Sequence, residues 1–293
     1  MAVATIIGGA GRMGTWFADF LRKNDYRIII SDNNDRHGRS LARQKRYRFI
    51  KDPRLAVQTA QLVVIATPTE ATERILLKIE PHLSPSCLLV EISSIKETVR
   101  AILQCMKRRG IAVLSIHPMF GPGTKNLAGK TIITTLLPRG RRAAEFLSLF
   151  QREGARIVRS DFEKHDQFAS FTLALPHFVN VAFVNALKNS GLNPNELRAV
   201  AGTTFKLQLL IAEMVCRESF GNEISILLDS KRSLETLKAF VRCSNRTLWM
   251  LSREKRGDLL QDLREGQRYL QRDLIFTGAD RHFNAAVEAS SAH

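Results

Sequence analysis

The feature that most constrains the fold is a glycine-rich turn between an apolar run and an amphipathic stretch at the start of the chain. Residues 3–7 are mostly β-branched and predict a strand, whereas residues 15–23 predict an amphipathic helix. Between them, Gly9, Gly11 and Gly14 fit the pattern Gly-x-Gly-x-x-Gly. The first glycine permits a tight turn, the second lets backbone amides approach a phosphate, and the third lets helix and strand pack closely. A doubly wound, Rossmann-like domain that binds a dinucleotide at this helix N-terminus is therefore predicted.

The first half of the chain alternates short apolar runs with amphipathic stretches, as a parallel sheet with crossover helices requires. Several runs are apolar on both faces, which is typical of buried parallel strands. We expect strands at residues 3–7, 27–31, 62–66, 88–92, 112–116, 131–136 and 156–159. From residue 162 to about 270, long segments of 3.6-residue periodicity with few Gly or Pro predict only helices. The expected domains are a nucleotide-binding domain at 1–160 and an all-helical domain at 161–293.

Length and composition point to an ordinary globular protein. The 293 residues suffice for one large or two ordinary domains, and 44% of them are apolar. No apolar run approaches the ~20 residues that span a bilayer, and no basic region or cleavage site precedes the first strand. A cytoplasmic protein without a membrane segment is expected. The four cysteines are widely scattered, so neither a metal site nor a disulfide framework is predicted.

The chain is strongly basic, with a formal net charge of +16, and most of its cations are arginines. Guanidinium groups bind carboxylates and phosphates in a two-pronged way, so anionic partners are favoured. No nucleic-acid-binding module or basic stripe with interleaved aromatics is apparent. An anionic small-molecule substrate is therefore a better prediction than nucleic acid.

An acidic residue stands where a dinucleotide-binding fold needs one. Asp32 follows the second expected strand, 18 residues after Gly14, and a carboxylate there would accept hydrogen bonds from ribose hydroxyls and repel a 2′-phosphate. NAD is therefore the predicted cofactor, bound also by Arg12 and Met13 of the turn. NADP remains open because Arg36, His37 and Arg39 lie just beyond Asp32 and could hold a phosphate. An ordinary helix-capping aspartate is the structural alternative.

Polar residues follow three more of the expected strands, whose carboxyl ends should open onto the ligand crevice. Thr67 and Pro68 follow the strand at 62–66, Ser94 follows the strand at 88–92, and His117 follows the strand at 112–116. Ser94 could instead cap a helix beginning near Lys96, with Glu97 completing a capping box. Because an imidazole ordinarily titrates near neutral pH and this one is expected beside the predicted cofactor, a role of His117 in proton transfer is favoured over a structural one.

Taken in order, these segments resemble the prephenate and arogenate dehydrogenases of tyrosine biosynthesis. The resemblance rests on the glycine turn at 8–14, Ser94-Ile95-Lys96, the run His-Pro-Met-Phe-Gly-Pro at 117–122, His165-Asp166 and Leu175-Pro176-His177. It implies a nicotinamide-binding domain followed by an all-helical dimerisation domain, and hence a homodimer. It also implies oxidative decarboxylation of a cyclohexadienyl substrate such as prephenate, with hydride passing to NAD.

The resemblance also implies roles for individual residues. His117 matches the catalytic histidine that draws off the hydroxyl proton, and Ser94 matches a serine that helps to orient it. His177 matches a histidine on the substrate side of the cleft, although a packed core histidine remains an alternative. His165 is expected to be structural. Lys96 is either a ligand of a substrate carboxylate or a solvated first-turn residue.

One position departs from the family pattern. Alignment of Phe205-Lys206-Leu207 puts Met214 where the family commonly has an arginine that holds a substrate carboxylate. Lys206 and Arg217 are the remaining candidates for that cation. The choice between prephenate and arogenate therefore stays open. Further alternatives are a related two-domain reductase and a regulator that senses a dinucleotide without turning it over.

Overall fold

The computed structural model describes residues 1–217, 220–228, 230–271, 283, 285 and 286, and for 217 and 220–223 only the backbone. The chain divides into two compact units, Met1–Ala169 and Ser170–His293, and each is considered by itself. Helix α7 (Phe162–Ala169), which follows the expected boundary at residue 160, belongs by its contacts to the first unit.

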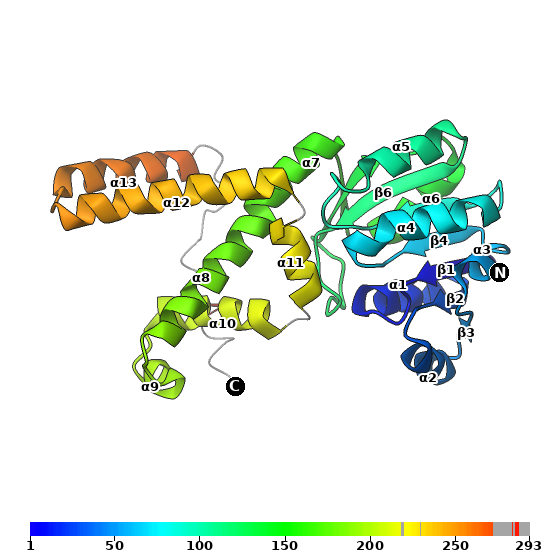
Figure 1. The fold of residues 1–293 in the computed structure, drawn as a ribbon, viewed down its shortest axis with the longest axis horizontal. Helices are drawn as coiled ribbons and strands as arrows, with labels where there is room; N and C mark the ends of the chain where they lie inside the picture. Colours follow the sequence, from blue (N-terminus) through cyan, green and yellow to red (C-terminus); the bar gives the residue numbers. More distant parts are fainter. Residues whose placement is uncertain (218–219, 229, 272–282, 284, 287–293) are drawn as a thin grey trace. The chain divides into compact units, whose positions relative to one another are not determined.

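The first unit is built on one eight-stranded sheet of order β3-β2-β1-β4-β5-β6-β7-β8. Its strands are β1 (Val3–Ile7), β2 (Arg27–Ser31), β3 (Arg48–Phe49), β4 (Leu62–Ile65), β5 (Leu88–Glu91), β6 (Ala112–Pro118), β7 (Thr131–Leu136) and β8 (Arg156–Arg159). The Rossmann-like α/β architecture predicted from the sequence is confirmed, and each expected strand is present (Figure 1).

Two features of the sheet differ from the expectation. The short edge strand β3 has too few residues to give a periodic signal. The sheet is also mixed rather than parallel, because β7 runs antiparallel to β6 and β8 runs parallel to β7. The chain between β6 and β7 contains no crossover helix and returns beside β6 in the opposite direction.

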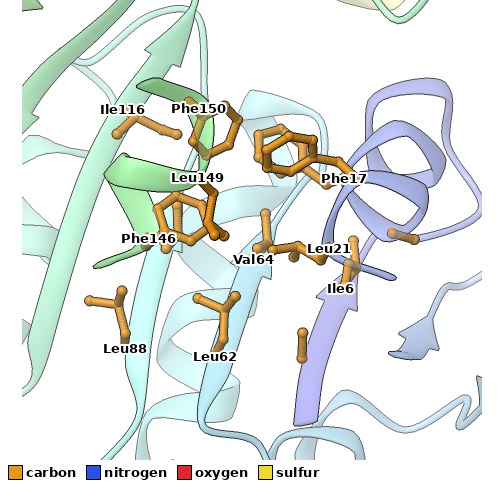
Figure 2. Close-up of a cluster of buried hydrophobic side chains, with 14 of the residues drawn as sticks. Ile6, Phe17, Leu21, Leu62, Val64, Leu88, Ile116, Phe146, Leu149 and Phe150 are labelled. Carbon is orange, nitrogen blue, oxygen red and sulfur yellow. The ribbon is translucent and has the colours of Figure 1, made fainter. Parts of the chain in front are cut away.

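Helices cover both faces of the sheet. They are α1 (Arg12–Lys23), α2 (Asp35–Lys45), α3 (Pro53–Val57), α4 (Thr69–Ile79), the 3-10 turn η1 (Glu80–His82), α5 (Arg100–Arg108), α6 (Arg141–Arg152) and α7. Side chains alternate across the strands, so that Ile6 and Val64 point to one core while Ile7 and Val63 point to the other. Figure 2 shows α1 and α6 covering the first of these cores through Phe17, Leu21, Phe146, Leu149 and Phe150.

The second unit is helical throughout its described residues, as predicted. It comprises a π-helical turn η2 (Ser170–Ala174), α8 (Leu175–Asn189), α9 (Pro194–Ala199), α10 (Thr203–Arg217), α11 (Phe220–Leu228), α12 (Lys231–Ser252) and α13 (Arg256–Gln271). Helices α12 and α13 lie side by side as a long hairpin (Figure 1). Helix α13 has no buried residue, and even its apolar Leu263 and Tyr269 are 71% and 74% exposed. The described residues of this unit thus expose many large apolar side chains.

One helical stretch is longer and more apolar than the sequence reading allowed. The helical stretch Phe162–Asn189 contains an 18-residue window with a mean hydropathy of 1.4, and by length and composition it could cross a membrane. The stretch also carries His165 and Asp166, whose side chains are buried and bonded within the first unit. Core helices of water-soluble proteins have the same length and composition, so these two properties do not assign it to a membrane.

The aromatic core between α1 and α6 should dominate the stability of the first unit. Phe150 is fully buried and stacks on Phe20 with ring centroids 4.5 Å apart. We expect Phe150→Ala to lower the free energy of unfolding by about 3–5 kcal/mol, because it removes buried area and leaves a cavity. Denaturant titration measures the change. Leu77→Ala, at a site that is 52% exposed, is the control, and an equal loss there would contradict this assignment of the core.

Candidate functional site

The glycine turn has the geometry that a dinucleotide needs. Gly8 has a φ of +76°, and a Cβ atom there would lie 2.5 Å from the carbonyl oxygen of Ala66. A Cβ on Gly14 would overlap the carbonyl oxygen of Gly8, so α1 can approach β1 closely only with glycine there. Gly11 is the N-cap of α1, without a side-chain cap or an acidic residue in the first turn. The backbone N–H groups at the start of α1 are therefore suited to bind an anionic pyrophosphate.

A crevice of about 970 Å³ adjoins this turn. Of the predicted cofactor residues, Gly11, Asp32, Thr67 and Pro68 line it, together with Gly8 and Ala10. Gly9 and Gly14 shape the turn through close backbone approach, and Arg12 and Met13 form the first turn of α1. The crevice lies at the carboxyl ends of β1, β2 and β4, which is where open α/β sheets bind their ligands.

The Asp32 carboxylate also organises the turn. One oxygen accepts a hydrogen bond from the Ala10 N–H at 3.0 Å and the other accepts from the Asn34 N–H at 3.0 Å. Asn34, not Asp32, caps α2 through its bond from the His37 N–H. Asp32 thus ties the end of β2 to the glycine turn while facing the crevice. A ribose in the crevice would therefore meet a carboxylate whose position is already fixed.

Cations line the crevice from elements that the sequence reading did not single out. Lys51, Arg74 and Lys78 face it together with His37. Arg39, by contrast, is paired with Asp35 at 2.9 Å. The groups available to a ribose phosphate therefore come chiefly from the chain after β3 and from α4.

His117 lies inside β6, one residue before its end, and directly follows a register irregularity between Ser115 and Ile116. Such irregularities re-aim side chains next to functional sites. The imidazole is only 5% exposed. Its Nδ1 lies 2.9 Å from Nε2 of His165, which is carried by α7. The structure thus brings together two histidines that are 48 residues apart in the chain.

Asp166 determines the proton positions of both histidines. Its Oδ1 lies 2.7 Å from His165 Nδ1 and also accepts from the Lys96 N–H, while its Oδ2 accepts from the Glu97 N–H at 2.7 Å. Because an ionised carboxylate only accepts, His165 Nδ1 must carry a proton. A neutral His165 then accepts at Nε2, so His117 donates from Nδ1. The lone pair of His117 Nε2 remains available as a base.

The turn after β5 differs from the predicted capping box. Helix α5 begins at Arg100 rather than near Lys96, and the N–H groups of Lys96 and Glu97 are bonded to Asp166 rather than capped by Ser94. A carboxylate supplied from α7 therefore replaces the local cap. Ser94 lies half-buried in this turn.

Lys96 is not the solvated residue that was one of its two expected roles, and its ammonium is held by groups of the protein. Its ammonium is fully buried and donates to Glu91 at 2.8 Å and to the carbonyl oxygen of Ile116 at 2.7 Å. The Glu91 carboxylate also accepts from Ser115 at 2.7 Å. Lys96 therefore pairs with a carboxylate of the protein and anchors the strand that carries His117.

Burial controls the ionisation of this region. Burial holds the pKa of His117 well below its usual 6.5, and the neighbouring His165 and Lys96 lower that pKa further. Burial also lowers the pKa of Lys96, against the opposing effect of the Glu91 carboxylate. A neutral His117 is what a general base requires.

The predicted residues of the second unit are placed as follows. His177, in the first turns of α8, donates from Nδ1 to the carbonyl oxygen of Leu173 in the π-helical turn at 2.8 Å, leaving Nε2 unused by that bond. Lys206 is exposed near the start of α10, and Met214 is exposed on the same helix. Arg217 ends α10, and its side chain lies outside the described part of the chain.

Sequence reasoning missed the two residues that position His117. His165 is bonded to it and Asp166 holds His165, whereas the expectation for His165 was a structural role. The adjacent His and Asp at the start of the first helix after β8 were the available signal. Glu91 was also missed, although an acidic residue at the end of an otherwise apolar strand indicates a buried charge that needs a partner.

Comparison with known proteins assigns the family. Residues 17–158 match the model of the prephenate dehydrogenase nucleotide-binding domain, and residues 161–265 match that of the prephenate dehydrogenase dimerization domain. The chain belongs to the prephenate dehydrogenase family. The resemblance seen in the sequence motifs is thereby confirmed.

Individual relatives of the prephenate dehydrogenase family extend this finding. A probable arogenate/prephenate dehydrogenase of Methanocaldococcus jannaschii is 24% identical over 268 residues, which cover 90% of this chain and 60% of that protein. The T-protein of Enterobacter agglomerans is 26% identical over 80% of this chain and 58% of its own length. The chain thus spans about three-fifths of the length of these curated relatives.

A solved structure supports the fold. The prephenate dehydrogenase from A. aeolicus, in complex with hydroxyphenyl propionate and NAD+, has a TM-score of 0.73 at 20% identity. The alignment covers 93% of this chain and 99% of that one. It extends the shared architecture across both units of the chain.

The low pKa of His117 predicts a pH-dependent stability. Below pH 6.5 the unfolded chain takes up a proton at this residue while the folded chain does not, so stability present above pH 6.5 is lost as the pH falls toward the folded pKa. One such proton changes the free energy of unfolding by at most about 1.4 kcal/mol per pH unit. We expect His117→Asn to remove this component from denaturant titrations at a series of pH values.

His82→Asn provides the matched control, because His82 lies on the η1 turn and has no bond to the buried pair. An unchanged pH dependence in His117→Asn, with the control also unchanged, would show that His117 is not the titrating group.

Proposed function

We propose that this protein oxidises prephenate with loss of CO2, using NAD, and so forms 4-hydroxyphenylpyruvate. The observation that carries the proposal is the His117 imidazole, which is held through Nδ1 by His165 and Asp166, so that this network leaves its Nε2 lone pair unused. His117 lies one residue before the end of β6, in the same sheet whose β1, β2 and β4 ends line the crevice. A base placed there suits removal of a hydroxyl proton beside a bound dinucleotide.

NAD fits the site on the chain's own features: the unfilled glycine turn, the uncapped start of α1 and the Asp32 carboxylate. When bound, NAD supplies the hydride acceptor. His117 Nε2 takes the proton of the substrate hydroxyl as the C–H bond of the carbon that bears this hydroxyl is broken. Loss of the carboxylate as CO2 makes the ring aromatic and leaves its oxygen as a phenolate, which takes a proton back to give the product. Ser94, in the turn after β5, is assigned to the same hydroxyl.

Substrate anchoring is assigned to the second unit. His177 Nε2 and the Lys206 ammonium are the described groups proposed to face the substrate, with Arg217 as a further cation. Lys96 is excluded from this set by its pairing with Glu91. Because the carboxylate clamp common in the family is replaced by Met214, arogenate is the alternative substrate.

Cofactor choice depends on two opposing features of the crevice. Asp32 repels a 2′-phosphate, whereas Lys51, Arg74 and Lys78 attract one. Asp32 is held by two backbone N–H groups, so its charge is fixed at the end of β2. NAD is therefore proposed as the preferred cofactor.

Formation of reduced cofactor tests the proposal directly. Purified protein is offered prephenate or arogenate, each with NAD or NADP, and absorbance of the reduced nicotinamide is followed. We expect turnover with prephenate and NAD, and a fall in kcat of at least about 100-fold in His117→Asn with NAD binding retained. His82→Asn, a half-buried histidine outside the network, should keep full activity.

Other outcomes separate the alternatives. Faster turnover of arogenate would assign the amino substrate. Folded protein that binds NAD but turns over neither substrate would contradict the dehydrogenase proposal and favour a sensor. Oxidation of reduced cofactor with imines or 2-keto acids would instead favour a related two-domain reductase.

A homodimer through the helical unit is also proposed. The matched family model is a dimerization domain, and α12 and α13 expose Leu248, Leu251, Leu263 and Leu270. A surface of this kind is normally covered by another chain. We expect light scattering to report a dimer that Leu263→Glu weakens. Leu77→Glu, at an exposed site on α4, is the control, and a dimer equally tolerant of both changes would place the interface elsewhere.

A further inference from the structure

We infer that His165 is a second proton-holding residue of the site, which receives a proton from His117 when His117 takes one from the substrate hydroxyl. This inference rests on the proposed dehydrogenase function and deepens it. It assigns to His165 and Asp166 a role in the proton transfer itself, in addition to the orientation of His117.

The contacts form one continuous path. His117 Nδ1 lies 2.9 Å from His165 Nε2, and His165 Nδ1 lies 2.7 Å from Asp166 Oδ1. His165 is fully buried and Asp166 is 3% exposed. Because these groups are shielded from water, the proton on His117 Nδ1 has His165 as its only close acceptor within the described residues.

The surrounding charges favour a cation on His165 over one on His117. His117 has the Lys96 ammonium of the β5–α5 turn as a charged neighbour, whereas His165 bonds directly to the Asp166 carboxylate of α7. Glu91 of β5 is paired with Lys96 and reduces the effect of the ammonium, which still lowers the pKa of His117. Burial, His165 and Lys96 all lower the pKa of His117. A proton that arrives on His117 is therefore more stable once the charge has moved to His165.

The transfer balances in bonds and protons. The substrate O–H bond breaks and a bond between that proton and His117 Nε2 forms. The bond from His117 Nδ1 to its proton breaks and a new one forms at His165 Nε2. His117 ends as the neutral tautomer protonated at Nε2, His165 ends as an imidazolium, and Asp166 stays ionised. Loss of CO2 leaves the ring oxygen as a phenolate, and the reverse shift returns the proton through His117 Nε2 to that oxygen, which gives the hydroxyl of the product and restores both histidines.

Asp166 is a positioning residue in this scheme. Besides His165, it receives the Lys96 and Glu97 N–H groups, which fixes the turn that carries Ser94. Its substitution is therefore expected to disturb both the turn and the histidines. A substitution at His165 that preserves the hydrogen bond gives the cleaner test.

His165→Gln separates proton holding from orientation. A glutamine oxygen can accept from His117 Nδ1 and keep the ring in place, but it cannot hold a proton at neutral pH. We expect kcat to fall roughly 10-fold or more while KM changes little. The rate of the wild-type enzyme in H2O–D2O mixtures should vary nonlinearly with deuterium content, since two protons move, and His165→Gln should make that variation linear.

Glu163→Gln is the matched control. Glu163 lies on the same helix as His165, and the substitution removes only its exposed ion pair with Arg100 of α5, in which the nitrogen and oxygen are 2.8 Å apart. It should leave kcat and the solvent isotope dependence unchanged. If His165→Gln keeps the wild-type rate and the nonlinear dependence, the second transfer does not occur and the inference is overturned.

A measurement without turnover distinguishes failure of this inference from failure of the proposed function. In wild-type protein labelled with ¹⁵N-histidine, NMR should find His117 protonated at Nδ1 and bare at Nε2. As the pH falls, the first proton taken up by the pair should reside on His165. Uptake on His117 first would overturn the relay even in an active enzyme. Uptake on His165 in a protein that oxidises neither substrate would leave the relay standing and reject the substrate proposal. This test needs no variant to fold.

Discussion

The geometry of the site depends on one carboxylate that comes from outside the sheet. Asp166 of α7 accepts from the imidazole of His165 and from two backbone N–H groups of the β5–α5 turn. An ionised carboxylate with three donors fixes position and proton location together, because it can only accept. Through it, β6 with His117, the turn with Ser94 and helix α7 become one rigid constellation.

A second buried interaction supports the first. Taking the Glu91 and Lys96 charges out of water costs more than their attraction returns unless further hydrogen bonds satisfy both groups. Here Ser115 donates to the carboxylate, and the carbonyl oxygen of Ile116 accepts from the ammonium. The value of such a pair lies in specifying one arrangement of β5 and β6, because any shift of either strand would leave a buried charge unpaired.

The sequence predicted the sheet well because its signals were local. Apolar runs located seven strands, and three glycines located the nucleotide turn. What it could not show depends on contacts distant in the chain. The direction of β7 follows from how the chain returns beside β6, and the cap on Lys96 and Glu97 comes from Asp166, about 70 residues away. The two roles expected of Lys96, a ligand of a substrate carboxylate or a solvated residue, missed its pairing for the same reason, since nothing in the sequence shows that its ammonium is buried against Glu91.

The two buried interactions have opposite effects on a positive charge at His117: the Lys96 ammonium disfavours it, and the Asp166 carboxylate, through His165, favours it. Burial, with smaller contributions from His165 and Lys96, makes a positive charge on His117 unfavourable, which keeps the imidazole neutral and ready to accept a proton. A base kept neutral in this way is a weak one, because the same forces oppose its protonated form. The Asp166 carboxylate, acting through His165, offsets that weakness only at the moment when a proton arrives. An isolated histidine in the same buried position would be neutral, but no carboxylate would stabilise the proton that it accepts. The second histidine therefore matters to the chemistry as much as the first.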